Sequence, residues 1–143
     1  MEYLGIALAY SIGIHSMIYP YSEITTIHLE ITSKCNASCP MCGRNKFGGP
    51  DNEFLPQTEL TLADIQRIMP DDFVRQLKRL YMCGNYGDPI AADETLEVFA
   101  WLRQLNPKIK LGLHTNGGAR TPVWWSKLGA ILSPSGDYCK FGI

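Results

Sequence analysis

The feature that most constrains the fold is a regular alternation of strand-like and helix-like segments over residues 24–143. Period-two or compact apolar runs predict strands at residues 27–31, 79–83, 110–115 and 138–143. Amphipathic patterns of helical period lie between them, at residues 61–69, 92–105 and 122–132, with a shorter helical turn at 72–78. Alternating strands and helices form right-handed crossover units in a parallel sheet. The sequence therefore predicts an α/β fold, and both a doubly wound sheet and a barrel satisfy the pattern.

The starts of two predicted helices are marked by capping residues. Thr61 offers a capping hydroxyl, and Asp64 supplies a carboxylate three residues further on. Thr121 precedes Pro122, and proline fits the first helical position because no N–H is needed there.

Length and composition limit the class of protein. A chain of 143 residues has room for one domain, since a domain averages roughly 150 residues. With 45% apolar and 19% charged residues the chain can pack a core, which excludes a disordered polyelectrolyte. The formal net charge is -1 and there is no Lys/Arg run, so no nucleic acid partner is expected.

Residues 1–23 form an apolar N-terminal leader, followed by a core domain predicted at residues 24–143. The leader lacks the basic start of a signal peptide and carries Glu2 and His15. Its apolar run, residues 4–18, is shorter than the roughly 20 residues of a membrane-spanning helix. We therefore expect a buried or capping segment and no membrane association.

Three of the five cysteines fall within eight residues, too close together for a disulfide framework. This usage predicts a reducing, cytoplasmic environment. Cys35, Cys39 and Cys42 are spaced by four and three residues, and their thiolates suit zinc or an iron–sulfur cluster. A structural site needs four protein ligands. The local motif supplies three, so one metal position stays open to a small molecule.

Other interpretations of the cysteines stay open. In one alternative, Cys83 or His28 completes a four-ligand zinc site. In another, the three cysteines lie close together in the sequence by chance and bind no metal. Cys139 is expected to pack in the core of the last strand.

The distinctive polar motifs all follow predicted strands. The cysteines follow the first strand, Gly87-Asp88-Pro89 follows the second and Asn116-Gly117 follows the third. In parallel α/β folds this places them together at the carboxyl edge of the sheet, where ligands bind.

These motifs, in this order, resemble the signature of the radical S-adenosylmethionine superfamily. The C-x3-C-x2-C spacing, the Gly87-Asp88-Pro89 motif, residues 114–117 and residues 140–143 are each similar to a strand-end element of that family, and the match covers roughly residues 24–143. The resemblance implies a partial TIM-like barrel of about four βα units. Because such a barrel needs about 200 residues or more, we expect the core domain to be truncated at its fourth strand.

The resemblance also implies cofactors and a mechanism. Cys35, Cys39 and Cys42 would bind a 4Fe-4S cluster, and S-adenosylmethionine would chelate its fourth iron. Reductive cleavage would give a deoxyadenosyl radical that abstracts hydrogen from an unidentified substrate, with a reductant such as flavodoxin or ferredoxin. The alternative is a noncatalytic zinc or iron–sulfur module for structure or electron transfer. No catalytic residue is assigned.

Three residues are assigned to the S-adenosylmethionine site. Asp88 would bind the ammonium group of the ligand, Gly87 would allow close approach of the backbone, and Asn116 would hold the third loop or face the ligand. Turn roles compete with these assignments, because Asp beside Gly and Pro often bonds its own backbone and Asn-Gly favours positive φ.

Several other polar and aromatic residues are expected to have structural roles. Arg44 and Arg120 are expected to be solvated at the surface. His114 is expected to be a satisfied interior histidine, and Trp124 and Trp125 are expected to pack against the core.

Overall fold

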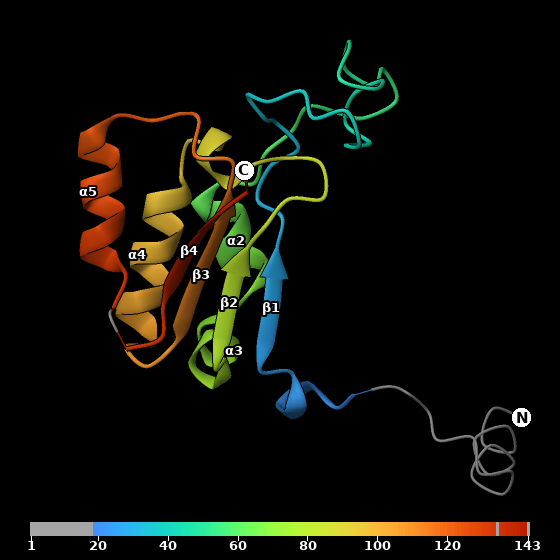
Figure 1. Cartoon of the computed structure of the whole chain (residues 1–143). Coiled ribbons are helices and arrows are strands. Elements are labelled where there is room, and N and C mark those ends of the chain that lie inside the picture. The colour runs from blue at the N-terminus through green and yellow to red at the C-terminus, as the bar shows by residue number, and fades with distance from the viewer. Residues whose placement is uncertain (1–18, 134, 143) are drawn as a thin grey trace, which may run out of the picture.

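The computed structural model describes residues 19–133 and 135–142, so most of the predicted leader lies outside the described residues. The strands are β1 (Thr26–Leu29), β2 (Arg79–Met82), β3 (Lys110–Thr115) and β4 (Tyr138–Phe141). The α-helices are α2 (Leu62–Ile68), α3 (Asp71–Gln76), α4 (Thr95–Leu105) and α5 (Pro122–Ile131). Two short 3-10 helices, η1 (Tyr21–Glu23) and η2 (Pro89–Ala91), accompany them (Figure 1). In this part of the chain no helix is both long and apolar enough to cross a membrane.

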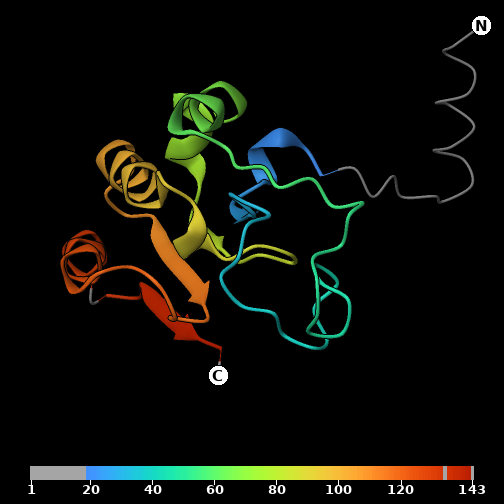
Figure 2. The same cartoon turned by 90° about the horizontal axis from the view of Figure 1, so that it is seen from above.

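The strands form one parallel sheet in the order β1-β2-β3-β4. Because each crossover steps to the next strand in the same direction, right-handed connections bring the helices to the same face. Figure 2 shows the helices, coloured green to red, along one side of the sheet. A doubly wound sheet would reverse its strand order and carry helices on both faces. The fold is therefore a partial TIM-like barrel.

The hydrophobic core lies between the sheet and the helices. Alternate strand residues contribute to it, and Leu80, Met82, Leu111 and Leu113 are all fully buried. Phe99 of α4 belongs to the same cluster and is also fully buried. Removing such side chains from water stabilises the packed state by about 1.5–3 kcal/mol each.

Capping explains where the helices begin. The predicted capping box at the start of α2 is confirmed, with Thr61 and Asp64 each accepting the N–H of the other. The start of α5 is also confirmed, because the hydroxyl of Thr121 accepts the N–H of Trp124. Helix α4 begins at Thr95, later than the predicted 92, because the 3-10 helix η2 ends at Ala91 and a turn over residues 92–94 separates it from α4.

The face of the sheet opposite the helices carries a row of imidazole and phenol rings. His28 stacks on Tyr81 with ring centroids 4.9 Å apart, and His114 lies 5.9 Å from Tyr81 and 5.4 Å from Tyr138. The Tyr138 ring fits beside β3 because Gly112 has no side chain: a Cβ there would lie 2.4 Å from Tyr138 Cζ. The face that a barrel encloses is thus polar and aromatic.

Two glycines give a matched test of this packing. Gly112→Ala should lower the free energy of unfolding by about 1–3 kcal/mol, because the Tyr138 ring must move. Gly129→Ala should raise it by about 0.4–1 kcal/mol, because Gly129 is an exposed helical residue with open space around the added Cβ. Urea unfolding of the full chain measures both values. Equal effects of the two substitutions would contradict this account.

Candidate functional site at the carboxyl edge of the sheet

A cavity of about 320 Å³ opens at the carboxyl edge of the sheet. Its lining includes Gly87, Asp88 and Asn116, the three residues that the sequence assigned to a ligand site. Cys83 and His114 also line it, from the ends of β2 and β3. The loops that follow neighbouring strands therefore meet at one edge, as the sequence predicted.

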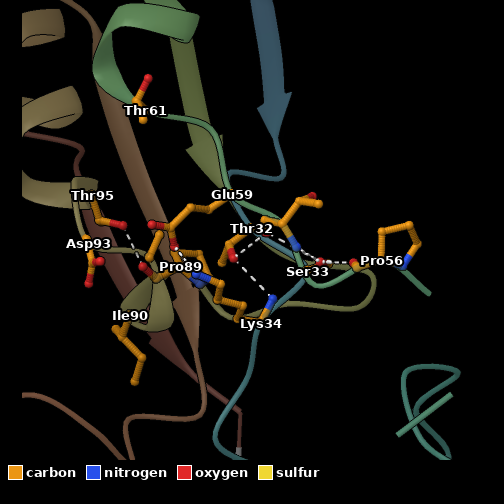
Figure 3. Close-up of polar contacts among 12 residues, drawn as sticks. Thr32, Ser33, Lys34, Pro56, Glu59, Thr61, Pro89, Ile90, Asp93 and Thr95 are labelled. Atoms are coloured by element: carbon orange, nitrogen blue, oxygen red, sulfur yellow. Dashed lines mark hydrogen bonds and ion pairs between the residues drawn. The ribbon is translucent and has the colours of Figure 1, made fainter. Parts of the chain in front are cut away.

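The cysteine loop, residues 33–60, is closed at its base by backbone pairing. Thr32 and Glu59 form an antiparallel bridge, and the Thr32 hydroxyl donates to the Thr58 carbonyl at 2.9 Å. The amide of Ser33 donates to the same carbonyl at 3.0 Å, and Lys34 Nζ pairs with Glu59 at 3.1 Å (Figure 3). The loop thus leaves the sheet edge from a fixed base and rises beyond the strand ends (Figure 1).

The three clustered cysteines are free thiols in this loop. Cys35 is half-buried, and its sulfur accepts the N–H of Ala37 at 3.4 Å and a side-chain N–H of Asn116 at 3.5 Å. Cys39 is exposed and Cys42 is half-buried. Within residues 19–133 and 135–142, no three His, Cys, Asp or Glu side chains lie close enough together to hold one metal ion. The role of these thiols as metal ligands stays a prediction.

Asp88 joins the loops that follow β2 and β3. Its side chain is 5% exposed, and Oδ1 accepts the N–H of Ile90 at 3.0 Å, which caps η2. Oδ2 accepts the backbone N–H of Asn116 at 2.7 Å. The turn role weighed from the sequence is present, and a second bond reaches across the edge of the sheet. Contact between this carboxylate and a ligand stays a prediction.

Asn116 connects the third loop to the cysteine loop. Its side-chain amide donates to Cys35 Sγ and, at 3.0 Å, to Asn36 Oδ1. Its Oδ1 accepts the N–H of Gly118 at 2.7 Å, and Gly117 between them has a φ of 72°. Asn116 therefore forms the expected turn and also contacts a predicted metal ligand.

Gly87 brings the second loop against the first. A Cβ at Gly87 would lie 1.8 Å from the carbonyl oxygen of Thr32, so no other residue fits without moving the backbone. The next amide, that of Asp88, donates to the Lys34 carbonyl at 2.8 Å. The close backbone approach predicted for Gly87 is thus an approach to the cysteine loop.

Sequence analysis missed Glu30, which binds the second loop from the end of β1. Its carboxylate accepts the amides of Tyr86 at 2.8 Å and Gly87 at 3.2 Å, and Asn85 Nδ2 at 3.1 Å. Partial burial raises the pKa of Glu30, but the hydrogen bonds from these three residues outweigh it and hold the pKa below its ordinary value. The only sequence signal was its polar position in the alternation of the first strand.

Burial also shifts the pKa of two side chains that line the cavity, Cys83 and His114. It raises the pKa of the Cys83 thiol, and the nearby Glu30 and Asp88 carboxylates raise it further. It lowers the pKa of His114, as do Lys140 and His28. Both shifts favour the neutral form, so Cys83 resembles a packed thiol more than a thiolate ligand.

Comparisons with known proteins agree with this arrangement. No protein-family model matches the chain. The chain is 30% identical over 95 residues to GTP 3',8-cyclase of Staphylococcus haemolyticus (strain JCSC1435), which covers 66% of this chain and 27% of that protein. It is 29% identical over 92 residues to GTP 3',8-cyclase of Acidothermus cellulolyticus (strain ATCC 43068 / DSM 8971 / 11B), covering 64% and 25%.

The fold is similar to that of BtrN, solved in complex with AdoMet and 2-DOIA. The TM-score is 0.55 at 17% sequence identity, covering 75% of this chain and 42% of that one. These likenesses support the predicted resemblance to the radical S-adenosylmethionine superfamily. It spans about a quarter of the length of the curated relatives it matches.

The structure decides several side-chain expectations. Surface solvation of Arg44 is wrong, because Arg44 is buried. Arg120 is exposed, as expected, although its guanidinium also donates to two backbone carbonyls. His114 is half-buried beside Tyr138, as expected for a satisfied histidine. The predicted packing of residues 124–125 and of Cys139 against the core is confirmed.

The pKa of Glu30 gives a pH-dependent test of the site. Because its folded-state pKa is lowered, its contribution to stability is present at neutral pH and is lost as the pH falls through that pKa. At pH 7, Glu30→Gln should lower the free energy of unfolding by about 0.5–1.5 kcal/mol, and the difference from wild type should shrink at pH 3.

Urea unfolding at the two pH values measures this difference. Glu53→Gln is the matched control, since Glu53 lies in the cysteine loop and forms an exposed ion pair with Lys46. If Glu30→Gln lowers the free energy of unfolding as much at pH 3 as at pH 7, the charge of Glu30 does not contribute to stability.

Proposed function

We propose that this chain is the first part of a radical S-adenosylmethionine enzyme core. In this proposal Cys35, Cys39 and Cys42 hold three irons of a 4Fe-4S cluster, and S-adenosylmethionine binds at the fourth. The observation that carries the proposal is the position of the three free thiols. They lie in one loop, whose Cys35 contacts the Asn116 loop beside the cavity.

The donor set fits such a cluster. All three ligands are thiols, which suit iron–sulfur clusters, and three is the number that leaves one iron open. Cys35 Sγ already accepts two N–H groups, from Ala37 and Asn116, and these bonds hold the sulfur in place. In the alternative zinc site the metal would have to deprotonate Cys83, whose pKa is raised by burial and by the Glu30 and Asp88 carboxylates.

The chain's own residues would prepare the site in three ways. Asp88 holds the second and third loops together and presents a buried carboxylate at the cavity wall, suited to an ammonium group. Gly87 keeps the second loop against the first. Asn116 orients Cys35.

When bound, the cluster and S-adenosylmethionine would supply the radical chemistry, in which one-electron reduction would cleave the sulfonium and hydrogen would be taken from a substrate. The residues around the cavity would orient the ligand and exclude water. A reductant such as flavodoxin or ferredoxin is the proposed electron donor, and the proposed location is the cytoplasm. The substrate and the reaction outcome are left unassigned.

Anaerobic reconstitution tests the proposal. The full chain should bind about four irons, its electron paramagnetic resonance spectrum should shift when S-adenosylmethionine is added, and reduction should release deoxyadenosine. Cys35→Ala, Cys39→Ala and Cys42→Ala should each lower the iron content severalfold. Cys139→Ala is the matched control, because Cys139 packs against the core and should leave the iron content unchanged.

Two outcomes would contradict the proposal. A colourless protein that holds one zinc would favour the noncatalytic metal-binding module. Equal loss of iron in Cys139→Ala and Cys42→Ala would show that the three loop thiols are not a distinct ligand set.

A further inference from the structure

The cysteine loop has a polar interior. Within residues 33–60, all of which the structure describes, only Arg44 and Asn45 are buried, with 4% and 6% of their surfaces exposed. The large apolar residues of the loop point outward instead: Met41, Phe47 and Phe54 are 95%, 92% and 85% exposed. Hydrophobic burial therefore does not give this loop its shape, and hydrogen bonds must do so.

Arg44 makes the central contacts of this interior. Its Nη1 donates to Asp51 Oδ1 at 2.6 Å and its Nη2 donates to the carbonyl of Ala37 at 2.5 Å. Ala37 lies between Cys35 and Cys39, so the guanidinium reaches back into the cysteine segment from a position two residues after Cys42. Only arginine has a rigid fork that serves both acceptors at once.

Asn45, the next residue, also donates from its side chain to a backbone carbonyl of the cysteine segment. Its Nδ2 donates to the carbonyl of Cys39 at 3.2 Å, and its Oδ1 accepts the N–H of Gly48 at 2.6 Å. The backbone around the cysteines is thus held by side chains that follow them, with two carbonyls of the segment 35–42 as acceptors.

One donor of Arg44 is left over. Its Nε–H is buried and has no hydrogen-bond partner among the residues that the structure describes. A buried N–H without an acceptor is destabilising, and cluster sulfurs and cysteine thiolates are acceptors. The partner of Arg44 in the ion pair, Asp51, is 52% exposed, so water screens the carboxylate side of the pair while the guanidinium is buried.

We propose that Arg44 is a positioning residue for the cluster. It holds the metal-free cysteine loop in shape through Ala37 and Asp51. Its charge and its spare Nε–H then stabilise the anionic, thiolate-held cluster and raise the cluster's reduction potential. The inference rests on the proposed function for the cluster, while its first part concerns the metal-free chain alone.

Hydrogen exchange of the metal-free full chain tests the first part. Several amides of the loop are hydrogen-bonded, including that of Asn52, which donates to the Arg44 carbonyl at 2.7 Å. Arg44→Gln and Arg44→Lys should both speed exchange in residues 35–58 by about tenfold, because neither side chain can serve both acceptors. Arg67→Gln removes the same charge from an exposed ion pair on α2 and should leave this exchange unchanged.

Redox titration of the reconstituted protein tests the second part. Arg44→Gln should make the reduction potential of the remaining clusters more negative, because it removes a positive charge and an N–H donor that favour the more negatively charged, reduced state. Arg44→Lys keeps the charge and should shift the potential less. A purely structural role would lower the iron content of Arg44→Gln without moving the potential of the clusters that form.

The outcomes separate the inference from the proposed function. If wild-type protein forms a cluster and Arg44→Gln leaves either the loop exchange or the potential unchanged, the inference is overturned. If wild-type protein forms no cluster, the proposed function fails, and an unchanged exchange rate in metal-free Arg44→Gln would still refute the role of Arg44 in the loop.

Discussion

The arrangement of the site depends on one buried carboxylate. Asp88 accepts one N–H from its own turn and one from the loop after the next strand, while its own amide donates to the Lys34 carbonyl of the cysteine loop. Three strand-end loops are therefore tied to a single residue. A charged acceptor in a partly desolvated position forms stronger hydrogen bonds than a neutral one. This explains why loops with little apolar burial of their own keep a fixed relation to one another.

The fold was largely predictable because its determinants are local. Strand β3 was predicted with its observed bounds, and the caps of α2 and α5 are readable from Thr61 and Thr121. What local patterns could not decide was the choice between a barrel and a doubly wound sheet. That choice depends on strand order, which is a property of distant pairings. The late start of α4 was also missed, because Asp88 caps the separate 3-10 helix η2, which ends at Ala91 before α4 begins.

The candidate site was predicted less completely, and the gaps have a common cause. The sequence located Gly87, Asp88 and Asn116 at one edge, since each directly follows a strand. It could not find that Glu30 binds amides more than fifty positions away, because a polar residue at a strand end has no periodic signature. Burial of Arg44 was missed as well, because an arginine in an irregular loop is usually solvated.

The distribution of polar groups separates two tasks within the chain. The helix-covered face of the sheet is apolar and supplies stability, whereas the strand-end loops are held by charge-assisted hydrogen bonds. A polar group is less costly to place in a hydrogen-bonded loop than in an apolar core, because the loop offers oriented donors and acceptors. The three clustered thiols, Cys35, Cys39 and Cys42, therefore lie in a hydrogen-bonded loop, apart from the packing that holds the strands together.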